Sequence, residues 1–318
     1  MHYWRFRIRP LSLQITPWQA DTIFGSLCWA LRHLEGEASL KKFLEPFREG
    51  EPSFLISEAF PRGYLPLPFY LRVQRVEVQN QREYQRFKLV KKVNLLPEGE
   101  FAKACRGEAV QVDETALSLY QPYSRLHASI NRATGTTTAA EEDTGGNLYQ
   151  LHGHVMNPRD TEIAVYVADR TGESLELVQR LFRSLELTGF GRKKSSGAGA
   201  FRLVGDPEPW KPPQVQNGNG FVTLSGFVPR RQDPAVGYWQ LRVKHGKLGE
   251  TYATGGKSPF KKPWILLESG SCFQTGNTGE VYGRMLTDLS NAYPEVVQYA
   301  YAFPVPISFP DKIWEAAS

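Results

Sequence analysis

The 318-residue sequence has little cysteine and methionine, three of each, and it has no long hydrophobic run. Cys28, Cys105 and Cys272 are far apart, and no CxxC pair or Cys/His spacing fits a tetrahedral zinc site. A membrane-spanning helix needs about 18 or more consecutive apolar residues, and none occurs. The first ten residues alternate apolar with basic side chains, unlike the continuous apolar stretch of a secretory signal. We therefore expect a cytoplasmic protein with reduced thiols, without metal or cofactor.

An excess of one charge sign is also absent, since 38 Lys and Arg face 33 Asp and Glu, a net charge of +5. The small positive excess is similar on both sides of residue 206, so a binding site for anions must be a local cluster. The signatures GxxxxGK[ST], GxSxG, HExxH and GGDD do not occur, and there is no paired-aspartate metal motif. These absences exclude the best-marked nucleotide-binding, hydrolase, zinc-protease and cyclase classes.

Hydrophobic periodicity in the first part of the chain predicts a strand followed by a helix. Residues 3–15 alternate with a period of two and carry a basic face. Thr16 and Pro17, or else Asp21, could begin the helix that follows, and Gly36 is placed to end it. The many prolines and glycines in 45–71 favour a surface connection with one short strand.

The pattern further along predicts a second strand and helix series. We expect strands at 148–155 and 163–168 to pair as a hairpin, and a helix to run from a cap at Thr171 to Gly189. A last strand is expected at 200–204. The resulting βαββαβ order is that of a ferredoxin-like fold.

These elements divide into two domains of an α+β protein. The N-terminal domain, 1–206, has an insertion at about 72–135 and a glycine-rich loop at 189–199. A proline-rich linker follows at 207–219, and 220–318 form a smaller, strand-rich domain.

The glycine-rich loop is the most informative segment for function. Its glycines allow close approach of a ligand to the backbone, and its basic run and hydroxyl groups can bind phosphate oxygens. The glycines follow a helix and precede a strand, the reverse of a dinucleotide fingerprint. The alternative is an ordinary connection with solvated lysines. The candidate residues are Gly189, Gly191, Arg192, Lys193, Lys194, Ser195, Gly197 and Gly199.

Two other segments carry donors suited to nucleic acid. The candidates are Arg125, His127, Asn131 and Arg132 in the first segment, and Arg230, Arg231, Lys257 and Lys261 in the second. His127 could also act as a general acid or base on an RNA 2′-hydroxyl, although the sequence places no second catalytic group beside it. In the second segment basic residues alternate with aromatic ones, as in surfaces that stack bases and neutralise phosphates.

Taken together, residues 21–30, 54–61, 125–135, 189–199, 246–249 and 259–261 resemble the RAMP superfamily of CRISPR proteins. Within it, the order and spacing of these segments are similar to the fourth subunits of type III-A Csm interference complexes. The resemblance implies two RRM-like (ferredoxin-like) domains and a β-hairpin thumb, which would correspond to the basic residues at 72–92. It also implies that the loop at 189–199 is the RAMP glycine loop, and that Arg125, His127, Asn131 and Arg132 contact the 5′ tag of the crRNA.

The resemblance implies a non-catalytic, prokaryotic, RNA-binding structural subunit. Such a subunit holds the crRNA tag and contacts a large polymerase/cyclase-like Csm subunit and an adjacent backbone Csm subunit. One alternative is a metal-independent endoribonuclease of CRISPR repeat RNA that uses His127 as general acid or base. Another is a protein-docking scaffold without RNA contacts of its own.

Overall fold

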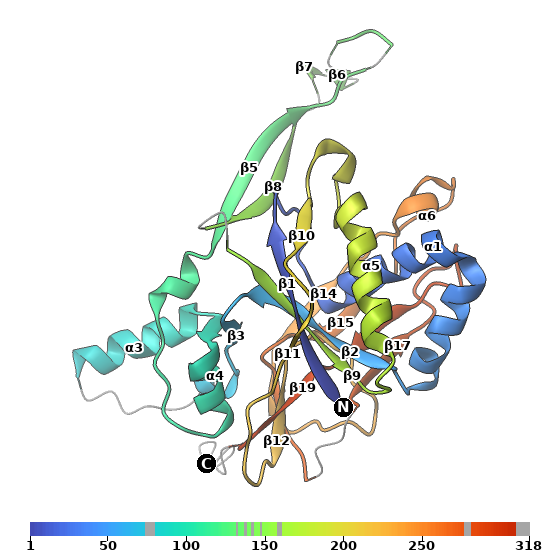
Figure 1. Ribbon diagram of the computed structural model, residues 1–318. Coiled ribbons are helices and arrows are strands. Elements are labelled where there is room, and N and C mark those ends of the chain that lie inside the picture. Colours follow the sequence, from blue (N-terminus) through green and yellow to red (C-terminus); the bar gives the residue numbers. More distant parts are fainter. Residues whose placement is uncertain are drawn as a thin grey trace.

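The chain forms a mixed α+β structure with several sheets, seen in a computed structural model (Figure 1). The structure describes residues 1–73, 80–131, 133–136, 139–140, 143–146, 148–157, 161–276 and 281–309. Within these residues, every helix is too short or too polar to cross a membrane.

The largest sheet is built from the N-terminal two thirds of the chain. Its strands are β1 (His2–Pro10), β2 (Phe54–Pro61), β9 (Ile163–Asp169) and β10 (Phe201–Leu203), in the order β10-β1-β9-β2 with all neighbours antiparallel. The short β11 (Glu208–Pro209) also pairs with β1. The strand predicted over 3–15 therefore ends at Pro10.

Helices α1 (Ala20–Glu49) and α5 (Ser174–Thr188) lie on one face of this sheet (Figure 1). They bury the apolar stripes that their spacing predicts, and Phe6 of β1 packs against Phe182 of α5 with 5.1 Å between ring centres. The chain does leave helical geometry at Gly36, where φ is 87°, but it then continues as helix to Glu49. The start also differs from the prediction, because Gln19 precedes the helix and Asp21 lies in its first turn.

Two sequence predictions differ from the structure. The short strand expected within the proline- and glycine-rich segment 45–71 is present as β2, but it is buried and pairs with β9 instead of lying in a surface connection. The strand at 148–155 does not pair with the one at 163–168. Instead, β8 (Leu148–Met156) pairs along its length with β5 (Tyr120–Ala128), while β9 lies between β1 and β2.

The segment between β2 and β9 combines packed elements with a projecting ribbon. Strands β3 (Tyr64–Pro66) and β4 (Leu95–Pro97) pair with each other, and α4 (Glu98–Cys105) buries Phe101, Ala104 and Cys105 in the core. Strands β5 and β8 rise clear of the body, with β6 (Ala139–Ala140) and β7 (Asp143–Gly146) at the tip, and α3 (Gln81–Lys92) projects from another side (Figure 1). The remaining elements are α2 (Tyr70–Val73) and the 3₁₀ turn η1 (Glu114–Leu117).

The regular structure of the described C-terminal third consists almost entirely of short strands. A four-stranded sheet has the order β13-β16-β12-β19, and β14 pairs with β15 and β17 with β18. In the described residues after 211, the one helix is the five-residue α6 (Glu250–Thr254). The strands are β12 (Gly220–Thr223), β13 (Gly237–Tyr238), β14 (Leu241–Lys244), β15 (Trp264–Leu267), β16 (Cys272–Gln274), β17 (Gly283–Leu286), β18 (Gln298–Tyr301) and β19 (Pro304–Ile307).

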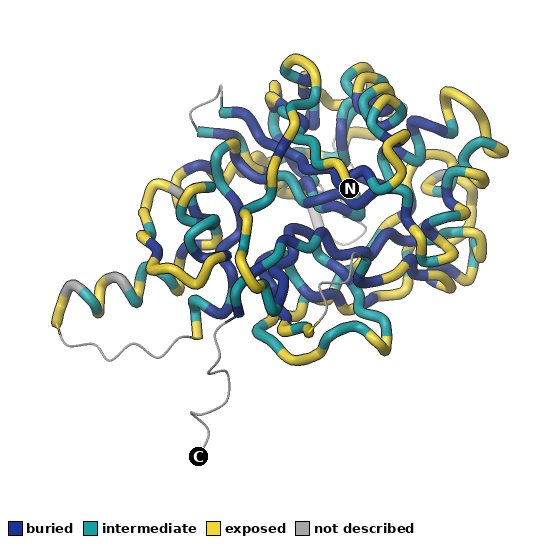
Figure 2. The backbone as a smooth tube through the Cα atoms, turned by 60° about the horizontal axis from the view of Figure 1, so that its bottom comes forward, coloured by how far each residue is buried: buried dark blue, intermediate teal, exposed yellow. Residues whose placement is uncertain are grey.

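One buried core joins the two parts of the chain. Phe24 of α1 stacks on Tyr299 of β18 with ring centres 4.7 Å apart, and the Tyr299 hydroxyl accepts a 3.0 Å hydrogen bond from the Ile56 N–H. Figure 2 shows the buried segments running through the middle of the body. The division at 207–219 stays a prediction, but hydrophobic packing continues across it.

Candidate nucleic-acid interface

The glycine-rich loop, residues 189–199, connects α5 to β10 and is anchored at its base by Phe190. This ring is 1% exposed and stacks on Trp18 with 3.9 Å between ring centres. The Phe190 N–H donates to the Gly199 carbonyl at 2.8 Å, and the Gly199 N–H donates to the Leu13 carbonyl at 2.9 Å. The two ends of the loop are thus fixed to each other and to the segment after β1.

Two of the glycines serve this closure rather than a ligand. A Cβ on Gly199, where φ is +73°, would lie 1.9 Å from the Phe190 carbonyl oxygen. A Cβ on Gly191 would lie 2.4 Å from the Thr16 Cβ. Gly189 also has a positive φ and faces Gly199, whereas Gly197 has open space around it. Only Gly197 therefore stands where a ligand could approach the backbone freely.

The basic residues of the loop are not equally available. Arg192 and Lys193 are exposed, and the Arg192 N–H donates to Thr16 Oγ1 at 2.9 Å, which fixes the backbone there. Lys194 forms an ion pair with Glu250 of α6, Nζ to Oε1 3.2 Å. Ser195 is exposed in the 3₁₀ turn η2 (Lys194–Ser196). Arg192 and Lys193 are consequently the cations of the described loop that form no ion pair within the described residues.

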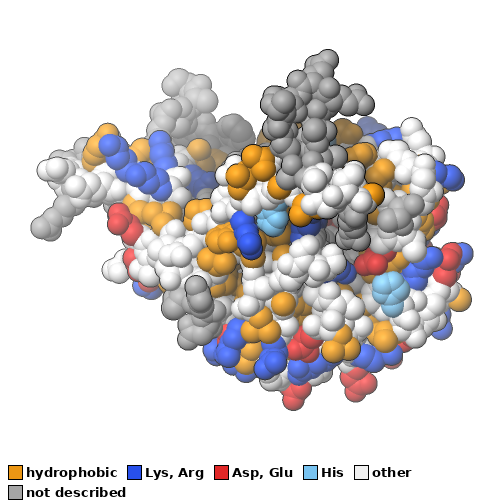
Figure 3. Space-filling view, turned by 90° about the horizontal axis from the view of Figure 1, so that it is seen from above, with side chains coloured by type: hydrophobic (Ala, Val, Ile, Leu, Met, Phe, Trp, Pro, Cys, Tyr) orange, Lys and Arg blue, Asp and Glu red, His pale blue; other side chains and the backbone are white. Residues whose placement is uncertain are grey.

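The structure brings the loop together with the ribbon residue His127. His127 on β5 lies directly opposite Tyr149 on β8, and their rings stack with centres 5.5 Å apart. Lys193 lies over the ring of Tyr149, with its Nζ 5.2 Å from the ring centre. The His127–Tyr149–Lys193 stack therefore joins the β5–β8 ribbon to the glycine-rich loop. Figure 3 looks down on this end of the molecule, where basic and hydrophobic side chains lie around a histidine.

His127 Nε2 is buried and has no hydrogen-bond partner within the described residues. Buried polar atoms usually have partners, so this nitrogen is a position where a further group could bind. Tyr149, which the sequence reasoning missed as a site residue, is 40% exposed. The position of Tyr149 directly opposite His127 could have identified it as a site residue, but only once β5 is known to pair with β8.

The other residues of the first ribbon segment have different surroundings. Arg125 is exposed two residues before His127, hence on the same face of β5. Asn131 holds a turn, because its Oδ1 accepts from the Ala133 N–H at 2.9 Å. Arg132 lies outside the described residues.

The second basic segment does not join this cluster. The Arg230 guanidinium donates to Asp233 Oδ1 at 3.2 Å and to the Val281 carbonyl, so it is used within the fold. Arg231 is exposed, and Lys257 Nζ lies 5.5 Å from the centre of the Tyr293 ring. Lys261 is half-buried, and its Nζ donates to Gln298 Oε1 at 2.6 Å.

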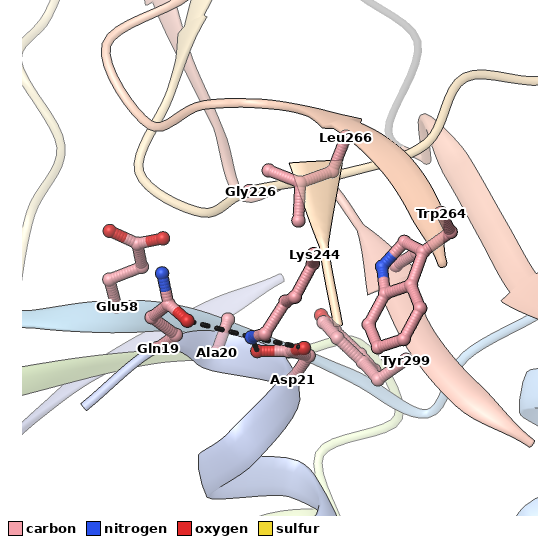
Figure 4. A pocket seen from close by; sticks show the side chains of 10 residues that line it. Gln19, Ala20, Asp21, Glu58, Gly226, Lys244, Trp264, Leu266 and Tyr299 are labelled. Atoms are coloured by element: carbon pink, nitrogen blue, oxygen red, sulfur yellow. Dashed lines mark hydrogen bonds and ion pairs between the residues drawn. The ribbon is translucent and has the colours of Figure 1, made fainter. Parts of the chain in front are cut away.

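Lys261 belongs to a buried polar cluster between α1 and the C-terminal strands (Figure 4 shows the pocket beside it). Lys244 Nζ donates to both oxygens of Asp21 at 2.6 Å, and Gln298 Nε2 donates to Asp21 Oδ2 at 2.8 Å. Burial lowers the pKa of Lys261 to about 8, with Lys244 adding to this and Asp21 opposing it. The cavity holds about 10 Å³, room for roughly one water molecule.

The polar side chains around this pocket thus hold parts of the fold together and do not form a ligand site. Burial also raises the pKa of Glu58, the second carboxyl beside the pocket, although the hydrogen bond from Ser269 acts to lower that pKa. Across the described residues, no three His, Cys, Asp or Glu side chains gather as a metal site would require.

Comparisons with known proteins agree on one family. The profile of the RAMP superfamily matches residues 19–202. A chain of the Csm1-Csm4 cassette in complex with cA4 has 17% identity and a TM-score of 0.66, covering 97% of this chain and 99% of that one. A chain of the Csm3-Csm4 subcomplex of the type III-A CRISPR-Cas interference complex has 14% identity and a TM-score of 0.59, covering 96% and 99%. Csm4 is the subunit that both complexes contain, so the similarity in fold is to Csm4. No curated protein matches the sequence.

Proposed function

Since the chain belongs to the RAMP superfamily, we propose that it is a non-catalytic, RNA-binding structural subunit of a type III-A CRISPR effector complex. The observation that carries this proposal is the His127–Tyr149–Lys193 stack beside the exposed Arg192. The stack offers aromatic surface and positive charge in one place, which is the combination that binds single-stranded RNA.

The arrangement of elements supports a ferredoxin-like fold for the first domain. With α1 after β1 and α5 after β9, the four strands of the main sheet follow the βαββαβ order. The insertion then lies after β2, and we propose that the thumb is the β5–β8 ribbon rather than the basic segment at 72–92. The scarcity of helix in the described residues after 211 makes the second RRM-like domain the weaker half of the fold prediction.

The chemistry of each residue gives it a separate task. Arg192 and Lys193 would bind phosphate oxygens, which position an RNA without reading its sequence. Tyr149 and His127 would contact a base or a 2′-hydroxyl, which select RNA. Lys194 would act indirectly, because its ion pair with Glu250 fixes the loop to α6.

We propose the 5′ tag of the crRNA as the RNA bound here. The proposed protein partners are a large polymerase/cyclase-like subunit and an adjacent backbone subunit. The similar structures support these partners, because their complexes pair Csm4 with Csm1 and with Csm3.

The endoribonuclease alternative has less support. General acid-base cleavage needs a second group within hydrogen-bond reach of the reacting atoms. Among the described residues, His127 contacts an aromatic ring and has no acidic or basic hydrogen-bond partner at Nε2. The ring is therefore better suited to contact than to proton transfer.

The decisive experiment reverses the charge of Arg192 and Lys193 in the assembled complex. We expect Arg192→Glu with Lys193→Glu to reduce crRNA retained after purification by roughly tenfold, because two phosphate contacts become repulsive. The matched control is Lys211→Glu with Arg284→Glu, two exposed positions away from the loop. Unchanged retention in the loop variant would favour the scaffold alternative.

A second measurement separates binding from catalysis. Repeat-containing RNA is incubated with the purified protein in EDTA, and the products are resolved on a gel. We expect no site-specific cleavage by the wild-type protein. Cleavage that disappears in His127→Ala would overturn the non-catalytic proposal and support the nuclease.

A further inference from the structure

A row of charged residues crosses the main sheet on the face opposite α1 and α5. Arg202 of β10 lies directly opposite Arg9 of β1. Glu162, just before β9, accepts from Arg9 Nη2 at 3.0 Å, and the Arg62 N–H after β2 donates to the Glu162 carbonyl at 2.8 Å. The row therefore reads Arg202, Arg9, Glu162, Arg62 across four neighbouring chain segments.

Further along the same face the charges are balanced. Arg5 pairs with Glu208 at 2.7 Å and with Glu98 at 3.5 Å, and Arg7 Nε lies 2.9 Å from Glu208 Oε1. The hydrogen bond from Arg5 holds the pKa of Glu208 below its usual range. These arginines are thus matched by carboxylates within the fold.

The exposed end of the face has an excess of arginine. Arg9, Arg62 and Arg7 all approach Glu162, at 3.0, 3.3 and 3.9 Å, and this carboxylate is 9% exposed. Arg9 and Arg62 are 45% and 46% exposed. Arg202 is exposed as well, and its guanidinium forms no ion pair with the described part of the chain.

Two like charges directly opposite each other on neighbouring strands destabilise a sheet unless something neutralises them. Arg9 and Arg202 are such a pair. The one acid that Arg9 contacts, Glu162, is also contacted by Arg62 and Arg7. Guanidinium groups bind phosphate in a planar, two-point geometry. We infer that Arg9, Arg62 and Arg202 form a second binding site for RNA backbone phosphates, separate from the glycine-rich loop.

The position of the row favours RNA over an acidic protein segment. The Leu11 N–H after β1 donates to the Ala200 carbonyl at 2.8 Å, so the row lies directly below the end of the glycine-rich loop. Gln14 and His154 exchange backbone hydrogen bonds, which fixes the ribbon to the same segment. Arg202 follows Gly199, the last residue of the loop, by three positions, so the row and the loop are adjacent along the chain. The inference therefore rests on the proposed function and extends the bound RNA onto the sheet.

The test measures binding of the full chain to a fluorescein-labelled 30-nucleotide oligouridylate over a series of salt concentrations. Arg202→Gln is the first variant, because it removes no ion pair of the described structure, and Arg9→Gln with Arg202→Gln is the second. Arg284→Gln, an exposed arginine on β17, is the matched control. We expect the double variant to bind roughly tenfold more weakly and to lower the log–log salt slope by about 1.4, about 0.7 for each lost contact. Polyglutamate of equal charge serves as competitor.

Each outcome bears on the inference. Weaker binding and a lower slope in the row variants, with an unchanged control, support it. If the loop variant Arg192→Glu with Lys193→Glu loses affinity while both row variants bind like wild type, the row is overturned and the proposed function stands. If wild type binds no RNA, both are overturned. If polyglutamate binds more tightly than RNA and depends on Arg202, the row is a protein-docking surface instead.

Discussion

At the scale of single residues, the glycines of the glycine-rich loop differ in how strongly the fold requires them, as Gly199 and Gly197 show. Gly199 and Gly197 both have a positive φ, +73° and +81°, so either would be strained by a side chain. The difference is space, because a Cβ on Gly199 meets the backbone of Phe190 and a Cβ on Gly197 meets nothing within 4 Å.

This contrast gives a matched pair of substitutions. We expect Gly199→Ala to lower the free energy of unfolding by roughly 2–4 kcal/mol, because Phe190 must move from its stacking position on Trp18. Gly197→Ala should cost about 1 kcal/mol, the strain of left-handed backbone alone. Urea denaturation of both variants measures the difference. Equal losses would mean that the loop does not need the close approach of Gly199 to Phe190.

At the scale of elements, the polar cluster between α1 and the C-terminal strands gives stability a pH dependence that can be assigned to one residue, Lys261. The pKa of Lys261 is about 8 in the folded chain, mainly because of burial, and its ordinary value is 10.5. Between these values the unfolded chain binds more protons, so stability rises with pH through this window. Below pH 8 the buried ammonium imposes its full cost.

We therefore expect wild type to gain stability relative to Lys261→Met as the pH rises from 7 to 10. The gain should be roughly 1–2 kcal/mol after allowance for the partial exposure of the side chain. Lys262→Met, next in the chain and 43% exposed, is the control and should show no such trend. Urea midpoints at several pH values measure both differences. If the difference in unfolding free energy between wild type and Lys261→Met stays constant over this pH range, Lys261 is not the source of the pH dependence.

The elements also show how far periodicity alone reaches. It predicts β1, α5 and β10 well, because each has a regular apolar stripe or alternation that the core uses. It misses the burial of β2, which it expects only as a short strand in a surface connection, because the residues of β2 are buried on both faces and lie between prolines and glycines. The partner of β8 is missed for a different reason. The pairing of β8 with β5 closes a loop of about 20 residues and has no turn motif that would predict it. The incorrectly predicted partner, β9, is nearer to β8 in sequence.

The same limit applies to the candidate site. The sequence predicts the loop and the ribbon residues separately, and the fold brings His127 and Lys193 together through Tyr149. The sequence groups Lys261 with the other candidate RNA contacts because basic and aromatic residues alternate around it. Its burial depends on Asp21 and Gln298, which are distant in sequence. Long-range contacts, rather than composition, decide which basic residues remain available.

At the scale of the whole molecule, the N-terminal sheet and the C-terminal strands share one hydrophobic core. Phe47 near the end of α1 accepts a hydrogen bond at its carbonyl from the Tyr301 hydroxyl, and Phe24 stacks on Tyr299. Trp210 lies between Tyr166 of β9, at 4.5 Å between ring centres, and Phe303, at 6.3 Å. Removing the C-terminal third would expose these aromatic surfaces and leave the Ile56 N–H without its acceptor.

A fragment of residues 1–206 should therefore not fold as an independent domain. Each large aromatic side chain left exposed costs about 1.5–3 kcal/mol of burial, and several are lost together, a loss comparable to the roughly 5–15 kcal/mol that stabilises a typical domain. We expect the full chain to unfold in a single transition in which tryptophan fluorescence and far-ultraviolet circular dichroism coincide. The fragment should show no cooperative transition and should bind hydrophobic dyes. A fragment that unfolds cooperatively, with dispersed amide resonances, would mean that the boundary at 207–219 separates two independent cores. The shared aromatic cluster would then be an interface between domains rather than the interior of one.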